Sequence, residues 1–197
     1  MISLVLDSAT VKLYVAIVKD NEVIYEKYQE GKNDHSKYIV SLIEEGLKLN
    51  NITVDDLDKV IVGNGPGSYT GVRMALTIGK MFAAFKNIKL YTVSTLFLMG
   101  SSLNEISSVR IDARRGNVFG MIYDFKNDSF VKNEGLYPTQ EINEGLITTE
   151  ENFKVDPLKV INKATFASNP DIVVPNYLRD TEAERNLKWL KEQKLMI

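Results

Sequence analysis

A glycine-rich stretch carries the strongest signal for chemistry in this sequence. Gly63-Asn64-Gly65-Pro66-Gly67-Ser68 follows an apolar run and precedes a segment with helical spacing. Glycine permits positive φ and close backbone approach, proline restricts φ, and the N–H groups at a helix start attract anions. The stretch predicts either a cradle for a phosphate or another anion, with Gly65, Gly67 and Ser68 as contacts, or a tight strand-to-helix turn.

The spacing of this stretch differs from the common nucleotide-binding motifs. No Gly-Lys-Ser or Gly-Lys-Thr follows it, as a P-loop requires. Its glycines also lack the spacing of the dinucleotide fingerprint. On chemistry alone we therefore favour the tight turn.

Asp7 and His35 are the two single titratable residues that we consider for a site. Asp7 ends the first apolar run. We expect it to point into a cleft and to join the glycine-rich stretch in contacting an anion or nucleotide, or else to serve as an ordinary turn residue. His35 is the only histidine, which excludes a site with several histidine ligands. We interpret it as a capping or surface histidine at a helix start.

The remaining charged residues form no complete set of acid, base and nucleophile. Asp112-Ala113-Arg114-Arg115 provides either polar contacts in a cleft or, as we favour, a solvated turn with an Asp–Arg pair. Arg179-Asp180, Glu182, Glu184 and Arg185 are most simply the exposed charges of a helix start. The chain has no cysteine, so disulfides, thiolate ligands and cysteine nucleophiles are absent. We expect no catalytic residues and no metal site.

The segment Thr70–Lys86 predicts a helix with two apolar faces, because its residues advance by about 100° each. One face contains Val72, Ala75, Leu76, Gly79, Phe82 and Ala83. The opposite face contains Met74, Ile78, Met81 and Phe85. A surface helix of a lone domain usually has one apolar stripe. The second stripe therefore predicts either a protein interface or a cover from another part of this chain.

The expected elements of the first hundred residues follow the order β-β-β-α-β-α-β-α. They are Ile2–Leu6, Val11–Val18, Val23–Gln29, a helix over His35–Leu49 with Asp34 as N-cap, a helical turn over Thr53–Leu57, Lys59–Gly63, the helix Thr70–Lys86, Leu90–Val93, and a helix that Ser94 caps and that ends near Leu103. The first three strands predict an antiparallel meander with the first strand central. The helical crossovers predict a mixed sheet with a parallel part.

The second half is less regular. We expect strands at Ser107–Ile111, Val118–Tyr123 and Ser129–Glu134, a hairpin turn at Arg114–Asn117, a helical turn at Ile142–Leu146, and a helix over Thr181–Lys194. The segments Phe153–Ile161 and Ala164–Phe166 fit either a helix or a strand.

Composition is that of an ordinary globular protein. The chain has 197 residues, of which 44% are hydrophobic, and a formal net charge of −2. Proteins that grip nucleic acid by themselves usually carry a basic face, so we expect no autonomous binding of DNA or RNA. The start of the chain does not resemble a signal peptide, and no apolar run approaches the roughly 20 residues that span a bilayer. We expect a cytoplasmic protein without a membrane partner.

Several motifs together resemble one known family. They are Leu6-Asp7-Ser8-Ala9-Thr10; His35-Ser36; Val62-Gly63-Asn64-Gly65-Pro66-Gly67-Ser68-Tyr69-Thr70-Gly71-Val72-Arg73; Val93-Ser94-Thr95-Leu96; Asp112-Ala113-Arg114 with Val118-Phe119; and Pro175-Asn176-Tyr177-Leu178-Arg179 with Ala183-Glu184. These resemble the TsaB family, also called YeaZ, whose members belong to the bacterial machinery that makes threonylcarbamoyladenosine in tRNA. The similarity spans nearly the whole chain and is lowest from about Asp124 to Ile172.

The resemblance implies an α/β fold of the actin, hexokinase and Hsp70 ATPase superfamily (ASKHA). Such a fold has two lobes with a common β-β-β-α-β-α core, and the C-terminal lobe is degenerate here. We expect an N-terminal lobe over residues 1–103 and a smaller C-terminal lobe over 104–180. A C-terminal helix within 181–197 would pack back on the first lobe.

The resemblance also implies a function. TsaD transfers the threonylcarbamoyl group to N6 of adenosine 37 in tRNA, and TsaB is its non-catalytic scaffold, joined by the P-loop ATPase TsaE. This chain lacks the second histidine that the metal site of TsaD requires. It also has Ser8 and Ala9 where nucleotide-binding relatives have glycine. We therefore expect no enzyme activity and no cofactor in the isolated chain. ATP and Mg²⁺ would bind only at the interface of the complex, and tRNA would bind only through the complex.

Family members commonly form a homodimer when the partner is absent, through the first two helices of the N-terminal lobe. The expected partner interface therefore comprises Tyr38, Leu42, Met74, Ile78, Met81 and Phe85. The alternative is an independent Mg-ATP-binding enzyme of the same superfamily, in which Asp7 and Gly65–Gly67 would hold Mg²⁺ and phosphate.

Overall fold

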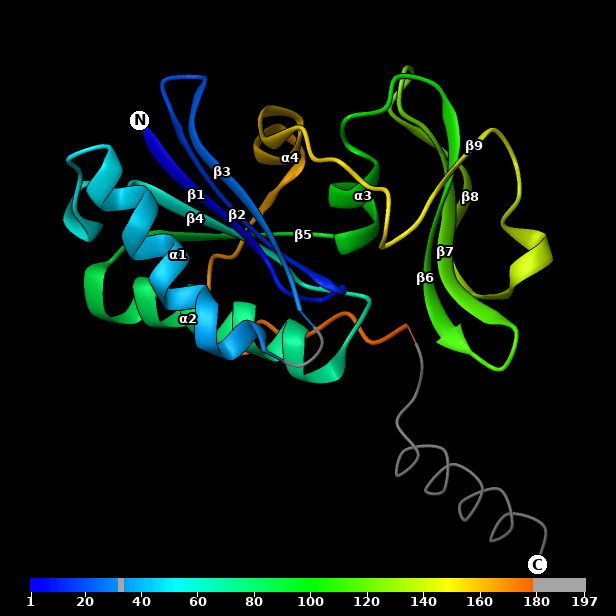
Figure 1. The fold of residues 1–197 in the computed structure, drawn as a ribbon, viewed down its shortest axis with the longest axis horizontal. Coiled ribbons are helices and arrows are strands. Elements are labelled where there is room, and N and C mark those ends of the chain that lie inside the picture. The colour runs from blue at the N-terminus through cyan, green and yellow to red at the C-terminus, as the bar shows by residue number, and fades with distance from the viewer. Residues whose placement is uncertain (32–33, 179–197) are drawn as a thin grey trace, which may run out of the picture.

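The computed structural model describes residues 1–31 and 34–178. Figure 1 shows two sheets: helices α1 and α2 cover one face of the first sheet, and α3 and α4 lie between its other face and the second sheet. The molecule is thus layered as helices, sheet, helices and sheet. No helix among the described residues is long and apolar enough to cross a membrane.

The first sheet has six strands in the order β10-β5-β4-β1-β2-β3. Its strands are β1 (Ile2–Asp7), β2 (Lys12–Lys19), β3 (Glu22–Glu30), β4 (Lys59–Gly63), β5 (Lys89–Val93) and β10 (Thr165–Phe166). β1 pairs antiparallel with β2 and parallel with β4, and β4 pairs parallel with β5. The predicted meander, the central first strand and the parallel part are therefore confirmed. β1 is apolar along its length because helices cover both faces of the sheet.

Helices α1 (His35–Leu49) and α2 (Tyr69–Lys86) follow the predicted apolar spacing, and a 3₁₀ turn at Val54–Asp56 confirms the expected helical turn. The side chain of Ser68 accepts a hydrogen bond from the Gly71 N–H and so caps α2. The first apolar face of α2 is buried on β4 and β5, with Gly79 against Val62 and Leu90. Asp34 precedes α1 but makes no side-chain cap, because its carboxylate pairs with Lys37.

The second sheet has four strands in the order β8-β7-β6-β9. They are β6 (Ile106–Arg114), β7 (Asn117–Asp124), β8 (Ser129–Pro138) and β9 (Leu146–Thr148), and a 3₁₀ turn at Thr139–Glu141 follows β8. The hairpin between β6 and β7 confirms the predicted turn. The prediction of a helical turn over Ile142–Leu146 is wrong. Leu146–Thr148 pairs in parallel with β6, and this long-range pairing leaves no local periodicity in so short a strand.

Helices α3 (Thr95–Gly100) and α4 (Pro157–Lys163) fill the space between the sheets. Ser94 caps α3 as predicted, but the helix ends at Gly100, which lies against the ring of Phe125. One buried cluster includes residues from the first sheet, from α3 and from the second sheet: Val5, Tyr14, Ala16, Ile61, Leu96, Leu98, Met99, Val109, Ile111, Met121 and Tyr123. The two sheets therefore share this buried cluster, while a second cluster lies between the first sheet and helices α1 and α2.

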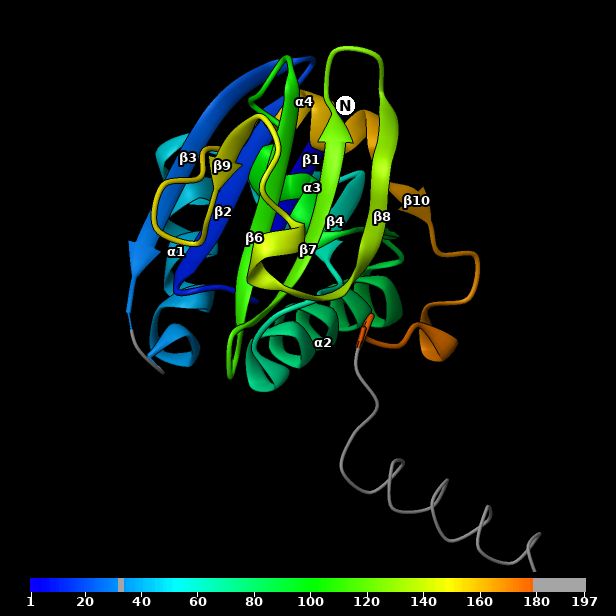
Figure 2. The ribbon, with the colours of Figure 1, turned by 90° about the vertical axis from the view of Figure 1, so that its right-hand side faces the viewer.

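The chain returns to the first sheet after the second sheet is complete. Thr165–Phe166 pairs antiparallel with β5 as an edge strand, and a 3₁₀ turn at Pro170–Ile172 follows beside α2 (Figure 2). Lys80 of α2 donates to the carbonyl of Asp171 at 3.0 Å. The prediction that residues 104–180 form a separate smaller lobe is corrected here, because Thr165–Phe166 belongs to the first sheet. The helix expected over Thr181–Lys194 and the charges from Arg179 onward lie outside the described residues.

Candidate functional site

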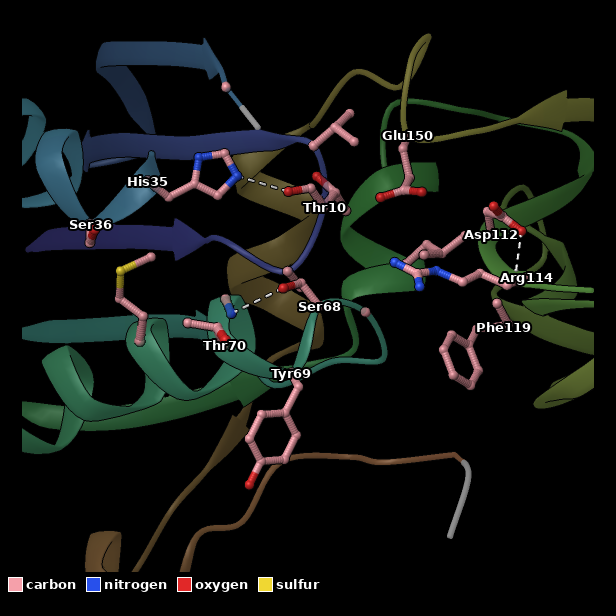
Figure 3. A pocket seen from close by; sticks show the side chains of 18 residues that line it. Thr10, His35, Ser36, Ser68, Tyr69, Thr70, Asp112, Arg114, Phe119 and Glu150 are labelled. Atoms are coloured by element: carbon pink, nitrogen blue, oxygen red, sulfur yellow. Dashed lines mark hydrogen bonds between the residues drawn. The ribbon is translucent and has the colours of Figure 1, made fainter. Parts of the chain in front are cut away.

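A cavity of about 750 Å³ opens between the two sheets. Figure 3 shows Thr10, His35, Ser68 and Tyr69 on the side of the first sheet. Asp112, Arg114, Phe119 and Glu150 face them from the second half of the chain. The turn after β1, the starts of α1 and α2, and the β6–β7 hairpin position these side chains. Several of the polar residues that the sequence predicts as candidates therefore line this cavity.

Asp7 is buried behind this cavity rather than pointing into it, which corrects the expectation for this residue. Its carboxylate accepts from the Thr95 hydroxyl at 2.7 Å and from the Ala9 N–H at 2.8 Å, and it lies against Gly63. Burial raises the pKa of Asp7 to about 6, while the bonds to Thr95 and Ala9 and the nearby His35 act in the opposite direction. Asp7 thus joins the end of β1 to the start of α3.

The turn after β1 is bonded directly to the glycine-rich stretch. The Ser8 hydroxyl donates to the Gly71 carbonyl at 2.7 Å, and the Ser68 N–H donates to the Ala9 carbonyl at 2.7 Å. A Cβ atom at Gly71 would clash with the carbonyl oxygen of Ser8. Gly71 is therefore needed for close approach of two backbone segments. The predicted tight turn is present.

The candidate anion contacts divide into two groups. Gly67 and Ser68 line the cavity, whereas Asp7 and Gly65 are buried. The Gly65 N–H is already bonded to the Thr95 hydroxyl at 3.2 Å. Asp7 and Gly65 also lie outside the lining of the cavity, so these two residues do not fit a magnesium-nucleotide site there. Within 1–31 and 34–178, no group of three or more His, Asp or Glu could hold a metal ion.

The β6–β7 hairpin brings charge into the cavity. Asp112 and Arg114 both line it, and the Asp112 carboxylate accepts from the backbone N–H of Arg114 at 2.8 Å. The solvated Asp–Arg pair that we favoured is not formed among the described residues, because Asp112 bonds backbone rather than guanidinium. Glu150 faces the hairpin, and burial raises the pKa of its carboxyl. The hairpin thus supplies polar contacts to the cleft.

His35 is buried, so its interpretation as a capping or surface residue is wrong. Its Nε2 lies 2.9 Å from the carbonyl oxygen of Thr10, to which it donates (Figure 3). The first residue of α1 is thereby bonded to the turn after β1. The isolated His35-Ser36 pair gave no signal for this contact, because its partner lies 25 residues earlier in the chain.

The segment before the end of the described chain closes over the glycine-rich stretch. The Asn176 N–H donates to the carbonyl of Asn64 at 2.7 Å. The ring of Tyr177 stacks on that of Tyr69 with centroids 5.3 Å apart. In the sequence, this segment is recognisable only as a motif of the family that the chain resembles. Its structural role is to hold the loop that starts α2.

A second candidate region is an exposed apolar surface on α1 and α2. Val40, Met81 and Phe85 are 64%, 52% and 79% exposed, and Met74 and Ile78 are half-buried beside them. We call these five residues the helical groove. Helical spacing places Val40 on the same flank of α1 as Ser36, and Ser36 lines the cavity together with Met74 of α2. Sequence reasoning did not select Val40, since α1 has only one clear apolar stripe.

Two residues of the expected partner interface lie elsewhere. Leu42 is only 8% exposed and packs in the core beneath α1. Tyr38 is partly exposed, but it shares a flank with Glu45, which pairs with Lys27 of β3. That flank faces β3 rather than α2. The structure therefore brings together Met74, Ile78, Met81 and Phe85 and leaves Tyr38 and Leu42 apart.

The sequence matches one family model over residues 23–169. The family is TsaD, described as tRNA N6-adenosine threonylcarbamoyltransferase. The chain is similar to the tRNA threonylcarbamoyladenosine biosynthesis protein TsaB of Bacillus subtilis strain 168, with 28% identity covering 98% of this chain and 100% of the relative. It is also similar to TsaB of Escherichia coli K12, with 30% identity covering 61% of this chain and 54% of the relative.

Solved structures show the same fold. YeaZ from Pseudomonas aeruginosa superimposes with a TM-score of 0.66 at 21% identity, over 73% of this chain and 69% of that one. A protein described as similar to peptidase YeaZ from Pseudomonas aeruginosa superimposes with a TM-score of 0.74 at 17% identity, over 90% and 99% of the two chains. The likeness extends through both sheets, since it covers most of this chain.

Proposed function

Because the chain belongs to the TsaD family and, within it, to the TsaB (YeaZ) proteins, we propose that it is a subunit of a tRNA-modifying complex. In this role it binds a TsaD-like enzyme and supports threonylcarbamoylation of adenosine 37 in tRNA without performing the chemistry itself. The order β-β-β-α-β-α of the first sheet and its helices supports assigning the fold to the ASKHA superfamily.

The observation that carries this proposal is the helical groove. Monomeric proteins seldom leave a contiguous apolar surface open, and methionine and phenylalanine are enriched in protein interfaces. Phe85 and Met81 are both more than half exposed on one helix, with Val40 on the neighbouring helix. The proposed occupant is the TsaD-like subunit, and a second copy of this chain takes its place when that subunit is absent.

The cavity residues support a non-catalytic role. The carboxylate of Asp7 is engaged by Thr95 and Ala9, and His35 is bonded to a backbone carbonyl. A general base needs to reach a substrate proton directly or through one water. Asp7 lies outside the lining of the cavity, and the Nε2 of His35 is occupied by the Thr10 carbonyl, which leaves only the buried Nδ1 without a partner. The proposal therefore includes no cofactor in the isolated chain, a TsaE-like ATPase as the second partner, tRNA contact through the complex, and a cytoplasmic location.

The experiment combines the chain with its cognate TsaD-like and TsaE-like proteins and measures threonylcarbamoyladenosine in tRNA with and without it. Met81→Glu is expected to abolish both complex formation and the stimulation, because it would bury an unpaired charge at the interface. Val131→Glu is the matched control, since Val131 is 49% exposed on β8, away from the groove. Equal binding by the wild-type chain and Met81→Glu would refute the assigned surface, and modification independent of the chain would refute the function.

One second candidate is an independent Mg-ATP-binding enzyme that would hold the nucleotide in the cavity rather than at the buried Asp7. The lining of the cavity includes the start of α2, with Ser68 and Thr70, and the guanidinium-bearing Arg114. Calorimetric titration of the isolated chain with Mg-ATP separates the two functions. We expect no binding at millimolar nucleotide. Tight binding that Arg114→Ala removes would favour the enzyme.

A further inference from the structure

We propose that the turn after β1, Ser8–Thr10, is a bracket that sets the spacing of α1 and α2 and thereby the shape of the helical groove, with His35 and Ser8 as its positioning residues. Its role here would be mechanical rather than chemical. The part of this proposal that concerns partner binding rests on the function proposed above, and the part that concerns helix spacing does not.

The first arm of the bracket holds α1. His35 is the first residue of α1 and is buried, and its Nε2 donates to the Thr10 carbonyl at 2.9 Å. A buried donor that loses its acceptor is left unsatisfied, so this bond resists displacement of the helix start. His35 is the only histidine of the chain, and the proposed function assigned it no chemical role.

The second arm holds α2 through two bonds. The Ser8 hydroxyl donates to the carbonyl of Gly71, within the first turn of α2, at 2.7 Å. The N–H of Ser68, the N-cap of the same helix, donates to the Ala9 carbonyl at 2.7 Å. Gly71 has no side chain, and a Cβ atom there would prevent this approach. Three consecutive residues of one turn are thus bonded to the starts of both helices.

The turn is itself rigid. Asp7 accepts from the Ala9 N–H at 2.8 Å, and the Thr10 hydroxyl donates to the Lys12 carbonyl at 2.9 Å. A rigid connector transmits displacement from one helix start to the other, whereas a flexible one would absorb it. The starts of α1 and α2 also border the cavity, because Ser36 and Met74 line it together with Thr10. The bracket therefore borders the cavity beside the starts of both helices.

The first test measures helix spacing without any partner. The chain has no cysteine, so Ser41→Cys on α1 and Thr77→Cys on α2 place two spin labels on exposed positions. Pulsed electron paramagnetic resonance should give one narrow distance distribution in the otherwise wild-type chain. His35→Ala should shift or broaden that distribution, and the milder Ser8→Ala should broaden it less. An unchanged distribution in both folded variants would overturn the proposal.

The control removes a buried hydroxyl of similar kind elsewhere. Ser101 is fully buried, and its hydroxyl accepts from the Asp156 N–H at 2.8 Å, far from the bracket in sequence. Ser101→Ala should lower the melting temperature but leave the distance between the labels unchanged. If Ser101→Ala broadened the distribution as much as His35→Ala, general loosening would explain both results and the bracket would be rejected.

The second test measures affinity for the TsaD-like partner. His35→Ala should weaken binding by about tenfold, because the groove would no longer be held in its binding shape. His35→Gln should restore most of the affinity, since its amide nitrogen can reach the position of Nε2, whereas the shorter His35→Asn should not. Loss of spacing with unchanged affinity would refute the groove as the partner surface, while affinity loss without a spacing change would refute the bracket.

Discussion

The cavity between the sheets and the helical groove contrast in how their side chains are satisfied. Behind the cavity, buried polar groups bond one another: Asp7 with Thr95, and Ser8 with Gly71. In the groove, apolar side chains such as Met81 and Phe85 remain exposed to solvent. A site for chemistry leaves polar groups free for a substrate, and a site for docking leaves apolar groups free for a partner.

The contrast also separates two kinds of sensitivity to mutation. Substitutions around the cavity wall should affect stability, because they disturb buried contacts between segments far apart in the chain. Substitutions in the groove should leave stability almost unchanged and affect association.

Gly71→Ala should be the most damaging single change in the cavity wall. The new Cβ would clash with the carbonyl oxygen of Ser8, a backbone atom that cannot move aside easily. We expect a loss of about 3 kcal/mol or more, which for a chain of this size lowers the melting temperature by roughly 10 °C. Gly31→Ala is the control, because a Cβ there makes only ordinary contact with Asp34. Equal melting temperatures for the two variants would contradict the close approach.

Asp7→Asn should stabilise the protein above pH 6. Since the pKa of Asp7 is raised from 3.8 to about 6, the unfolded chain releases this proton at lower pH than the folded chain. The stability associated with the neutral carboxyl is therefore fully present below pH 3.8 and is lost as the pH rises to 6. Asparagine stays neutral and avoids this loss.

Urea unfolding across pH 4 to 8 checks the behaviour of Asp7→Asn. The difference between the variant and the wild type should grow with pH and reach at most about 3 kcal/mol, corresponding to a shift of about two pKa units. The difference should disappear near pH 4. A variant that is less stable than the wild type at pH 8 would show that the bonds from Thr95 and Ala9 stabilise the ionised carboxylate by more than its burial costs.

Thr95→Val should destabilise the protein by about 2 kcal/mol, because it removes a hydroxyl that serves two buried groups. That hydroxyl donates to Asp7 and accepts from the Gly65 N–H. Thr95→Ser keeps the hydroxyl and should lose much less stability. Thermal unfolding of the two variants provides the comparison, and equal losses would assign the effect to the methyl group rather than to the hydrogen bonds.

Phe85→Ser should change the free energy of unfolding by less than about 0.5 kcal/mol, because its side chain is largely exposed. It should nevertheless weaken association with the TsaD-like partner. Val131→Ser is the matched control, since Val131 is 49% exposed but lies on β8, away from α2. The contrast between the two regions fails if Phe85→Ser unfolds the protein, or if both variants bind the partner equally well.

The sequence predicted the first half of the fold because its signals are local. The apolar run before Asp7, the helical spacing after His35 and the glycine-rich turn each specify an element within a few residues. The surroundings of Asp7 depend on Thr95, 88 residues away, and no local pattern reports such a contact. The expected cleft therefore exists, although its expected carboxylate is buried behind it.

The second half was predicted less well for a related reason. Leu146–Thr148 and Thr165–Phe166 are strands of three and two residues, too short for an alternating pattern. Each is a strand only because a longer strand lies beside it, β6 in one case and β5 in the other. The groove illustrates the same limit, because the apolar stripe of α2 was visible in sequence while the position of Val40 depended on how α1 is oriented.

The core shared by the two sheets determines when the chain can finish folding. Val5, Tyr14 and Ile61 of the first sheet are buried in the same cluster as Val109 and Met121 of the second. The edge strand that completes the first sheet follows both in the sequence. A nascent chain emerging from the ribosome would therefore hold an uncovered apolar sheet until the last quarter of the protein is made, and chaperones would be most needed during that interval.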